Sequence, residues 1–135
     1  MTQTYVNQLS YEIVGAAIEV HRNLGPGLLE SVYEHCLLKE LINKGLEVKT
    51  QVWLPVNYKG ELLEQKFKLD MLVNDLVIVE LKAVEAILPV HKAQLITYLK
   101  LAEKPKGLLL NFHTDNISKN LVPLVSEHFA SLPFS

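Results

Sequence analysis

The sequence predicts an α/β fold in which a mixed β-sheet is flanked by helices. Two segments with a helical apolar period come first, and two alternating segments typical of a β-hairpin follow them. A strand, a helix and a second strand then succeed one another, which indicates parallel pairing. With 135 residues and 49% hydrophobic side chains, we expect residues 1–135 to form a single domain.

The composition indicates a protein of the cytoplasm. Cys36 is the only cysteine, so no internal disulfide can form. The polar N-terminus does not resemble a signal peptide, and the apolar runs are far shorter than the ~20 residues of a membrane helix. A net charge of −2 argues against a broadly basic surface, so any nucleic-acid contact must come from a local patch.

Two helices are predicted before the sheet. In residues 9–24 the apolar side chains recur at three- and four-residue steps, and Ser10 is placed to cap this helix. Gly25-Pro26-Gly27 should end it. The second helix follows at once and should stop at Lys44-Gly45. Its apolar face comprises Leu29, Val32, Tyr33, Cys36, Leu37 and Leu41.

The predicted sheet begins where the apolar period changes to two. Residues 48–58 and 63–73 should form a hairpin around Lys59-Gly60-Glu61, each strand keeping its apolar residues on one side. Pro55 suggests an edge position or a break in the strand. Residues 76–83 are almost continuously apolar, which is typical of a central strand covered on both faces. A third helix ending at Ala102, a buried strand over residues 108–112 and a last amphipathic helix opened by Pro123 complete the prediction.

Two charged residues, Glu80 and Lys82, interrupt the apolar central strand. They lie two positions apart, so both side chains leave the same face. An unpaired charge buried there costs several kcal/mol, so each must be paired, neutralised or bound to a metal. A structural ion pair with another element is the alternative to a functional site.

Asp70 lies on the preceding strand, across the turn at Asn74-Asp75. Counting back from the turn places it nearly opposite Leu81 or a neighbour, where its carboxylate could meet that of Glu80. Carboxylates beside a lysine suit Mg²⁺ or Mn²⁺ better than zinc. Taken singly, Asp70 reads as a solvated strand residue, and only the combination predicts a metal site.

The same residues carry a resemblance to a known family. Gly27-Leu28-Leu29-Glu30-Ser31-Val32-Tyr33 matches a GxxExxY signature, and Asp70 with Glu80-Leu81-Lys82 is similar to an Asp and Glu-x-Lys pair. Gln94 to Tyr98 is similar to the Gln-x-x-x-Tyr motif of RecB-like nucleases. The chain therefore resembles the GxxExxY family of the PD-(D/E)XK nuclease-like superfamily, from about residue 13 to residue 112.

Two positions depart from the pattern. Leu69 stands where the superfamily motif often has proline, and His113 stands where a glycine is expected. Neither position carries the expected chemistry.

The resemblance implies a restriction-endonuclease-like αβββαβ core and a set of site residues. Glu30, His21 and Tyr98 each also have an ordinary structural explanation: a first-turn glutamate, a histidine near a helix end and a packed tyrosine. The implied catalytic residues are Asp70, Glu80, Lys82 and Gln94; the implied substrate-binding residues are His21 and Tyr98; the implied metal ligands are Glu30, Asp70, Glu80 and the Leu81 carbonyl.

The function implied is Mg²⁺- or Mn²⁺-dependent hydrolysis of phosphodiester bonds in nucleic acid, with DNA preferred to RNA. A catalytically silent module that binds protein or nucleic acid is the rival, because the chain has few basic residues. Hydrolysis of a nucleotide or another phosphoester would use the same residues. A homodimer is plausible, since small domains of this kind can pair on a duplex, and no membrane association is expected.

Overall fold

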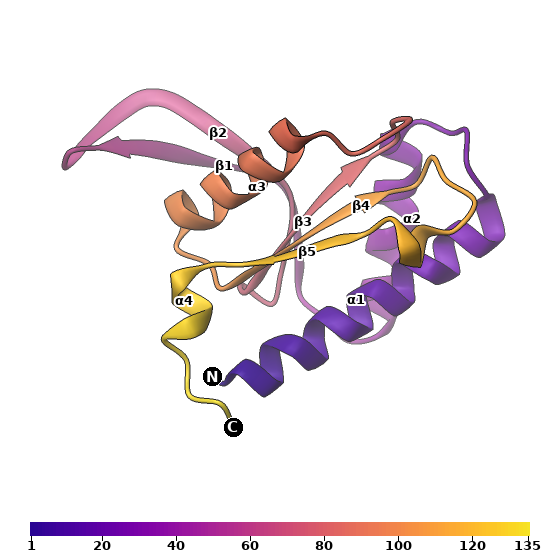
Figure 1. Cartoon of the computed structure of the whole chain (residues 1–135), viewed down its shortest axis with the longest axis horizontal. Coiled ribbons are helices and arrows are strands. Elements are labelled where there is room, and N and C mark those ends of the chain that lie inside the picture. The colour runs from indigo at the N-terminus through magenta and orange to yellow at the C-terminus, as the bar shows by residue number, and fades with distance from the viewer.

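A computed structural model describes residues 1–135 and contains one five-stranded mixed sheet with helices on both faces (Figure 1). The sheet order is β1-β2-β3-β4-β5, which agrees with the predicted α/β class. The elements in chain order are α1 (Gln3–Leu24), α2 (Glu30–Asn43), β1 (Val48–Tyr58), β2 (Glu61–Val73), β3 (Val77–Lys82), α3 (Pro89–Ala102), β4 (Lys106–Asn111), the 3-10 turn η1 (Ile117–Lys119), β5 (Val122–Val125) and α4 (Glu127–Ala130).

The pairing of the strands confirms the mixed sheet. The hairpin strands β1 and β2 are antiparallel, β2 pairs antiparallel with β3, and β3 pairs in parallel with β4. Helix α3 makes the crossover between the two parallel strands, as expected for such a connection. None of the helices is both long and apolar enough to cross a lipid bilayer.

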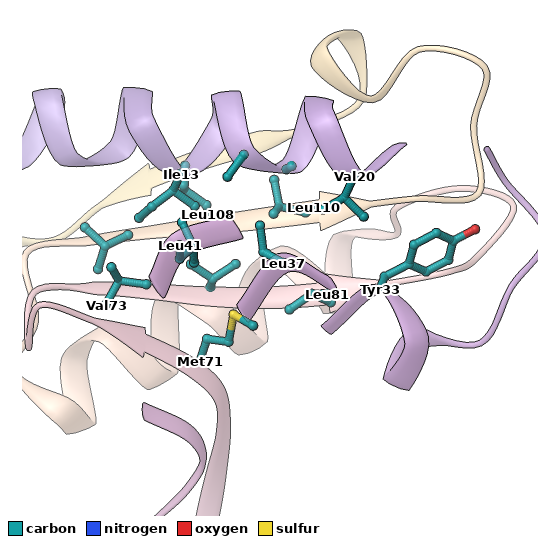
Figure 2. Close-up of a cluster of buried hydrophobic side chains, with 14 of the residues drawn as sticks. Ile13, Val20, Tyr33, Leu37, Leu41, Met71, Val73, Leu81, Leu108 and Leu110 are labelled. Atoms are coloured by element: carbon teal, nitrogen blue, oxygen red, sulfur yellow. The ribbon is translucent and has the colours of Figure 1, made fainter. Parts of the chain in front are cut away.

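The sheet separates two hydrophobic cores. Helices α1 and α2 cover one face, where Ile13, Leu37 and Leu41 meet Leu108 and Leu110 (Figure 2). Helix α3 covers the other face through Leu95 and Leu99, which pack with Ile78 and Leu109. Strand β3 is therefore buried on both faces, as its near-continuous apolar sequence predicts.

The hairpin exchanges its faces at the opposed residues Gln51 and Asp70, which corrects the prediction that each strand keeps one apolar side. Residues two apart on a strand normally share a face. Here Met71 packs in the α1–α2 core, whereas Leu69 packs in the α3 core. Gln51 has a left-handed backbone with φ of 52° at this point. Beyond it, the hairpin extends past the rest of the sheet (Figure 1).

Two helix predictions were wrong. Helix α1 begins at Gln3, where the Thr2 side chain accepts a hydrogen bond from the Tyr5 N–H at 3.0 Å, and Ser10 is buried within the helix instead of capping it. Pro123 lies in β5, opposite Leu108 of β4, and opens no helix. Because β5 is an edge strand, the missing N–H of proline is tolerated there. Pro55 is likewise on an edge strand, and the register of β1 against β2 shifts between Pro55 and Asn57, so both alternatives given for this proline are observed.

Candidate active site

The centre of the candidate site is the point where β2 separates from β3. Regular pairing of these strands ends at Met71 and Val79. At the next position, the Asp70 N–H donates to Glu80 Oε2 at 2.8 Å, and the Leu81 N–H donates to Asp70 Oδ2 at 2.9 Å. The two carboxylates thus take the place of backbone acceptors and hold the strands together at this point. Each keeps its second oxygen for another partner.

Glu80 is the most unusual titratable group in the chain. The residue is only 4% exposed, and its carboxylate faces the backbone of the neighbouring strand at Asp70. Burial, with a further contribution from the Asp70 carboxylate, raises the pKa of Glu80 from 4.5 to about 8, although the Asp70 N–H and the Lys82 charge oppose this rise. In the absence of a bound cation, Glu80 is therefore mainly protonated at neutral pH.

A hollow of about 380 Å³ adjoins Asp70 on the α2 side of the sheet. Three carboxylates and one ammonium group border it, so it carries an excess of negative charge. Such a hollow attracts cations and repels a phosphate that arrives alone. The residues that line it, which we call the acidic hollow, are Glu30, Ser31, Glu34, Gln51, Lys68, Asp70 and Leu81.

The GxxExxY segment positions one wall of the acidic hollow. Gly27 has a φ of 104°, which favours glycine, in the turn before α2. The buried Tyr33 hydroxyl donates to the Gly25 carbonyl at 2.6 Å and accepts from the Leu28 N–H at 3.1 Å. These bonds fix the turn at the start of α2. Glu30, in the first turn of the helix, is thereby held at the hollow.

Glu34 is a site residue that the sequence analysis missed. It lies one helical turn after Glu30 and accepts a hydrogen bond from Gln51 Nε2 at 2.7 Å. Burial raises its pKa, and the carboxylates of Asp70 and Glu30 act in the same direction. The four-residue spacing from Glu30 was the available signal, because residues so spaced share a helix face.

Lys82 and Tyr98 also lie near the paired carboxylates. Lys82 is half-buried at the end of β3, and its charge lowers the pKa of Glu80. Tyr98 of α3 packs against Phe67 with ring centroids 5.1 Å apart. Burial raises the pKa of the Tyr98 hydroxyl, and the charges of Glu80 and Asp70 raise it further. These two predicted residues therefore share an electrostatic environment with the carboxylates.

Two other predicted residues, Gln94 and His21, lie outside the acidic hollow. Gln94 is exposed on α3, one turn before Tyr98. His21 Nε2 donates to the Thr114 carbonyl at 2.6 Å, which ties the end of α1 to the loop after β4. The structure thus gives His21 a structural partner, and it brings neither residue to the carboxylates.

The predicted metal ligands are assembled in part. No group of three or more His, Cys, Asp or Glu side chains is close enough to hold an ion. Asp70 and Glu80 are adjacent, whereas Glu30 and Leu81 share the acidic hollow with Asp70. Carboxylate and carbonyl oxygens are the donors that Mg²⁺ and Mn²⁺ prefer, and a cation beside Glu80 would stabilise the charged form that burial disfavours. The donor set therefore fits a hard divalent cation.

Comparisons with known proteins bear on the superfamily and on the fold. The sequence matches the PD-(D/E)XK nuclease superfamily over residues 7–122. A similar solved structure is the crystal structure of SSO0001, with a TM-score of 0.53 and 23% sequence identity. The similarity covers 78% of this chain and 50% of that one, so this chain spans about half the length of its structural relative. That likeness shows a shared fold alone. Among curated proteins, none matches the sequence.

Proposed function

This chain belongs to the PD-(D/E)XK nuclease superfamily, and we propose that it is a Mg²⁺- or Mn²⁺-dependent nuclease that hydrolyses phosphodiester bonds, with DNA preferred to RNA. Nucleases of this superfamily generally use divalent metal ions. The observation that supports the proposal most strongly is the pair of hydrogen bonds where β2 leaves β3: the Asp70 N–H donates to the Glu80 carboxylate, and the Leu81 N–H donates to the Asp70 carboxylate, which lines the acidic hollow. Within the superfamily, we assign the chain to the GxxExxY family on the segment from Gly27 to Tyr33.

The charge of the acidic hollow is the reason to include a metal in the proposal. A phosphodiester is an anion, and carboxylates that border the hollow would repel it unless a cation offset their charge. Asp70, Glu80, Glu30 and the Leu81 carbonyl would hold the ion. When bound, a divalent cation supplies charge neutralisation and Lewis acidity for in-line attack by water.

Glu80 and Lys82 have distinct tasks in this proposal. Glu80 must release its proton before it can act as a ligand, and its pKa of about 8 makes that release depend on pH near neutrality. Lys82 follows on the same face of β3, where its ammonium can orient the attacking water or stabilise negative charge that develops on the phosphate. Tyr98, Gln94 and His21 remain proposed contacts to the substrate around this centre.

A catalytically silent module is the second candidate, and one observation favours it. No three carboxylate or imidazole side chains form a preassembled ligand group. A domain with this fold that only binds protein or nucleic acid would not need such a ligand group. For either function we propose that residues 1–135 act as one domain in the cytoplasm, with a homodimer as the proposed assembly.

Cleavage of supercoiled plasmid DNA, and of an RNA of similar length, tests the proposed function. We expect nicking with Mg²⁺ or Mn²⁺ that is lost on chelation. Lys82→Met should slow the reaction roughly 100- to 1,000-fold, the range for loss of one group that stabilises charge in the transition state. Asp70→Asn and Glu80→Gln should abolish it, whereas Glu64→Gln, an exposed change on β2, should leave it intact.

Circular dichroism of each variant separates loss of chemistry from loss of fold. Equal cleavage by the wild type and Asp70→Asn would place the chemistry elsewhere. A folded, Mg²⁺-loaded wild type that cleaves neither nucleic acid would favour the binding module.

A further inference from the structure

Trp53 is an exposed aromatic residue on the hairpin that the proposed active site does not use. It is the only tryptophan in the chain and is 60% exposed. Its neighbours Val52 and Leu54 pack on the α3 side of the sheet, so alternation along β1 directs Trp53 away from that core. The ring therefore makes no contribution to the α3 core and is available to a partner.

Lys68 joins the Trp53 ring to the acidic hollow. The two residues are opposite each other in the β1–β2 register, and Lys68 Nζ lies 5.3 Å from the centroid of the ring. Lys68 also lines the acidic hollow together with Asp70. Trp53 is thus at the edge of the candidate active site, and the lysine that holds one face of its ring leaves the opposite face open.

A second lysine extends the positive charge along the hairpin. Lys66 is exposed and lies two residues before Lys68, so both leave the same face of β2. It is opposite Pro55, two residues beyond Trp53 on β1. We call Trp53, Lys66 and Lys68 the Trp53 platform: an aromatic ring with two cations, which borders the acidic hollow.

We propose that the Trp53 platform binds a single-stranded segment of nucleic acid, with an unpaired base stacked on the open face of Trp53 and its phosphates next to Lys68 and Lys66. This inference rests on the proposed function, and it specifies the class of substrate as strands with unpaired bases. Aromatic side chains combined with cations are the usual means of binding single strands. Bases within a duplex stack on each other and do not offer a free face.

The composition of the platform favours nucleic acid over a protein partner. Protein interfaces are enriched in tryptophan and arginine, but lysine is depleted in them. Both cations of the platform are lysines. Phosphates accept lysine as a point charge, and their negative charge complements the two ammonium groups.

The fluorescence of Trp53 offers a direct test, because no other tryptophan contributes to the signal. The protein should carry Lys82→Met and contain Mg²⁺, so that the strand stays uncut while a cation offsets the charge of the acidic hollow. Short oligothymidylate and a duplex of the same length are titrated separately. We expect oligothymidylate to quench the fluorescence, because a stacked base quenches an indole, and the duplex to quench it less.

Variants measure the contribution of each residue through the binding of a labelled oligothymidylate. Trp53→Ala should weaken binding roughly 5- to 150-fold, the range for loss of one stacked base, and Trp53→Phe should restore part of it. Lys68→Ala should reduce the slope of log K against log salt by about 0.7, as expected when one phosphate contact to a single strand is lost. Tyr11→Ala, which removes a 75% exposed aromatic from α1, should change nothing.

Three results would overturn the inference. If oligothymidylate binds without quenching the fluorescence, and binds equally well to Trp53→Ala, then Trp53 is not part of the nucleic-acid site. The proposed nuclease function would still hold in that case if the protein cleaves plasmid DNA. A fluorescence change with protein concentration alone would assign Trp53 to contact between copies of the chain. If no nucleic acid binds, the proposed binding by the Trp53 platform is wrong. The cleavage assay then tests the nuclease function independently.

Discussion

Replacing Glu80 by glutamine should remove a specific pH dependence from the stability of the metal-free protein. The carboxyl of Glu80 is buried and has a pKa of about 8, against 4.5 for the exposed group in the unfolded chain. Between these two values the folded protein holds one proton more than the unfolded protein at this residue. Stability must therefore fall as pH rises through this window.

The size of the effect follows from the two pKa values. One pKa unit corresponds to about 1.4 kcal/mol, so the free energy of unfolding should fall by about that amount per pH unit and by at most about 5 kcal/mol in total. No free energy of unfolding should be lost below the pKa of Glu80 in the unfolded chain, and the loss should be complete above its pKa in the folded protein. Glu80→Gln mimics the protonated side chain and should stay nearly constant over the same window.

Urea unfolding in the presence of a chelator measures this difference. The free energies of wild type and Glu80→Gln are compared from mildly acidic to mildly alkaline pH. Subtraction removes groups common to both, including Glu34, whose pKa is also raised. Adding Mg²⁺ at alkaline pH should restore wild type and leave Glu80→Gln unaffected, because a ligand stabilises only the state that binds it. Parallel curves for the two proteins would refute the assigned protonation of Glu80.

Two further predictions concern packing around the site. Tyr33→Phe should lower the free energy of unfolding in urea by about 1 to 3 kcal/mol, because it leaves the Gly25 carbonyl and the Leu28 N–H without their buried partner. The control Tyr5→Phe removes an exposed hydrogen bond from Asn74 and should cost less than about 0.5 kcal/mol. Equal losses for the two variants would contradict the role given to the turn. Gly107→Ala should lower the free energy of unfolding by about 1 to 3 kcal/mol, because the added Cβ would meet Leu95 Cδ1 at 2.8 Å. Gly15→Ala, which has open space around it in α1, should raise the free energy of unfolding by about 0.5 to 1 kcal/mol. Shifts of the melting temperature with the same sign in both variants would contradict this.

The arrangement of the sheet could be predicted because the patterns involved are local. The apolar run around Val79 is typical of a strand covered on both faces, and the helix that follows implies parallel pairing. The start of α1 and the strand at Pro123 were missed for a shared reason. Each depends on distant contacts: the Gln3 N–H bonds to the Pro133 carbonyl, and β5 exists only because it pairs with β4.

The candidate site was predicted less completely than the fold. A carboxylate in an apolar strand is visible in sequence because its burial is costly, so Glu80 could be identified without the structure. The exchange of faces at Gln51 and Asp70 left no such signal, since the alternation of apolar residues continues through it. Glu34 lines the acidic hollow beside Glu30 and accepts a hydrogen bond from Gln51, a partner from a distant segment that the sequence does not reveal.

Mg²⁺ binding measured by calorimetry tests the central claim, that Asp70 and Glu80 together hold a divalent cation. Titrations of the wild type, Asp70→Asn and Glu80→Gln are repeated in buffers of different ionisation enthalpy. The wild type should bind Mg²⁺ and release close to one proton per ion at neutral pH, because Glu80 must ionise, and both variants should lose binding while they remain folded. Equal binding by all three proteins, or a folded wild type that binds no Mg²⁺ even at alkaline pH, would contradict the claim.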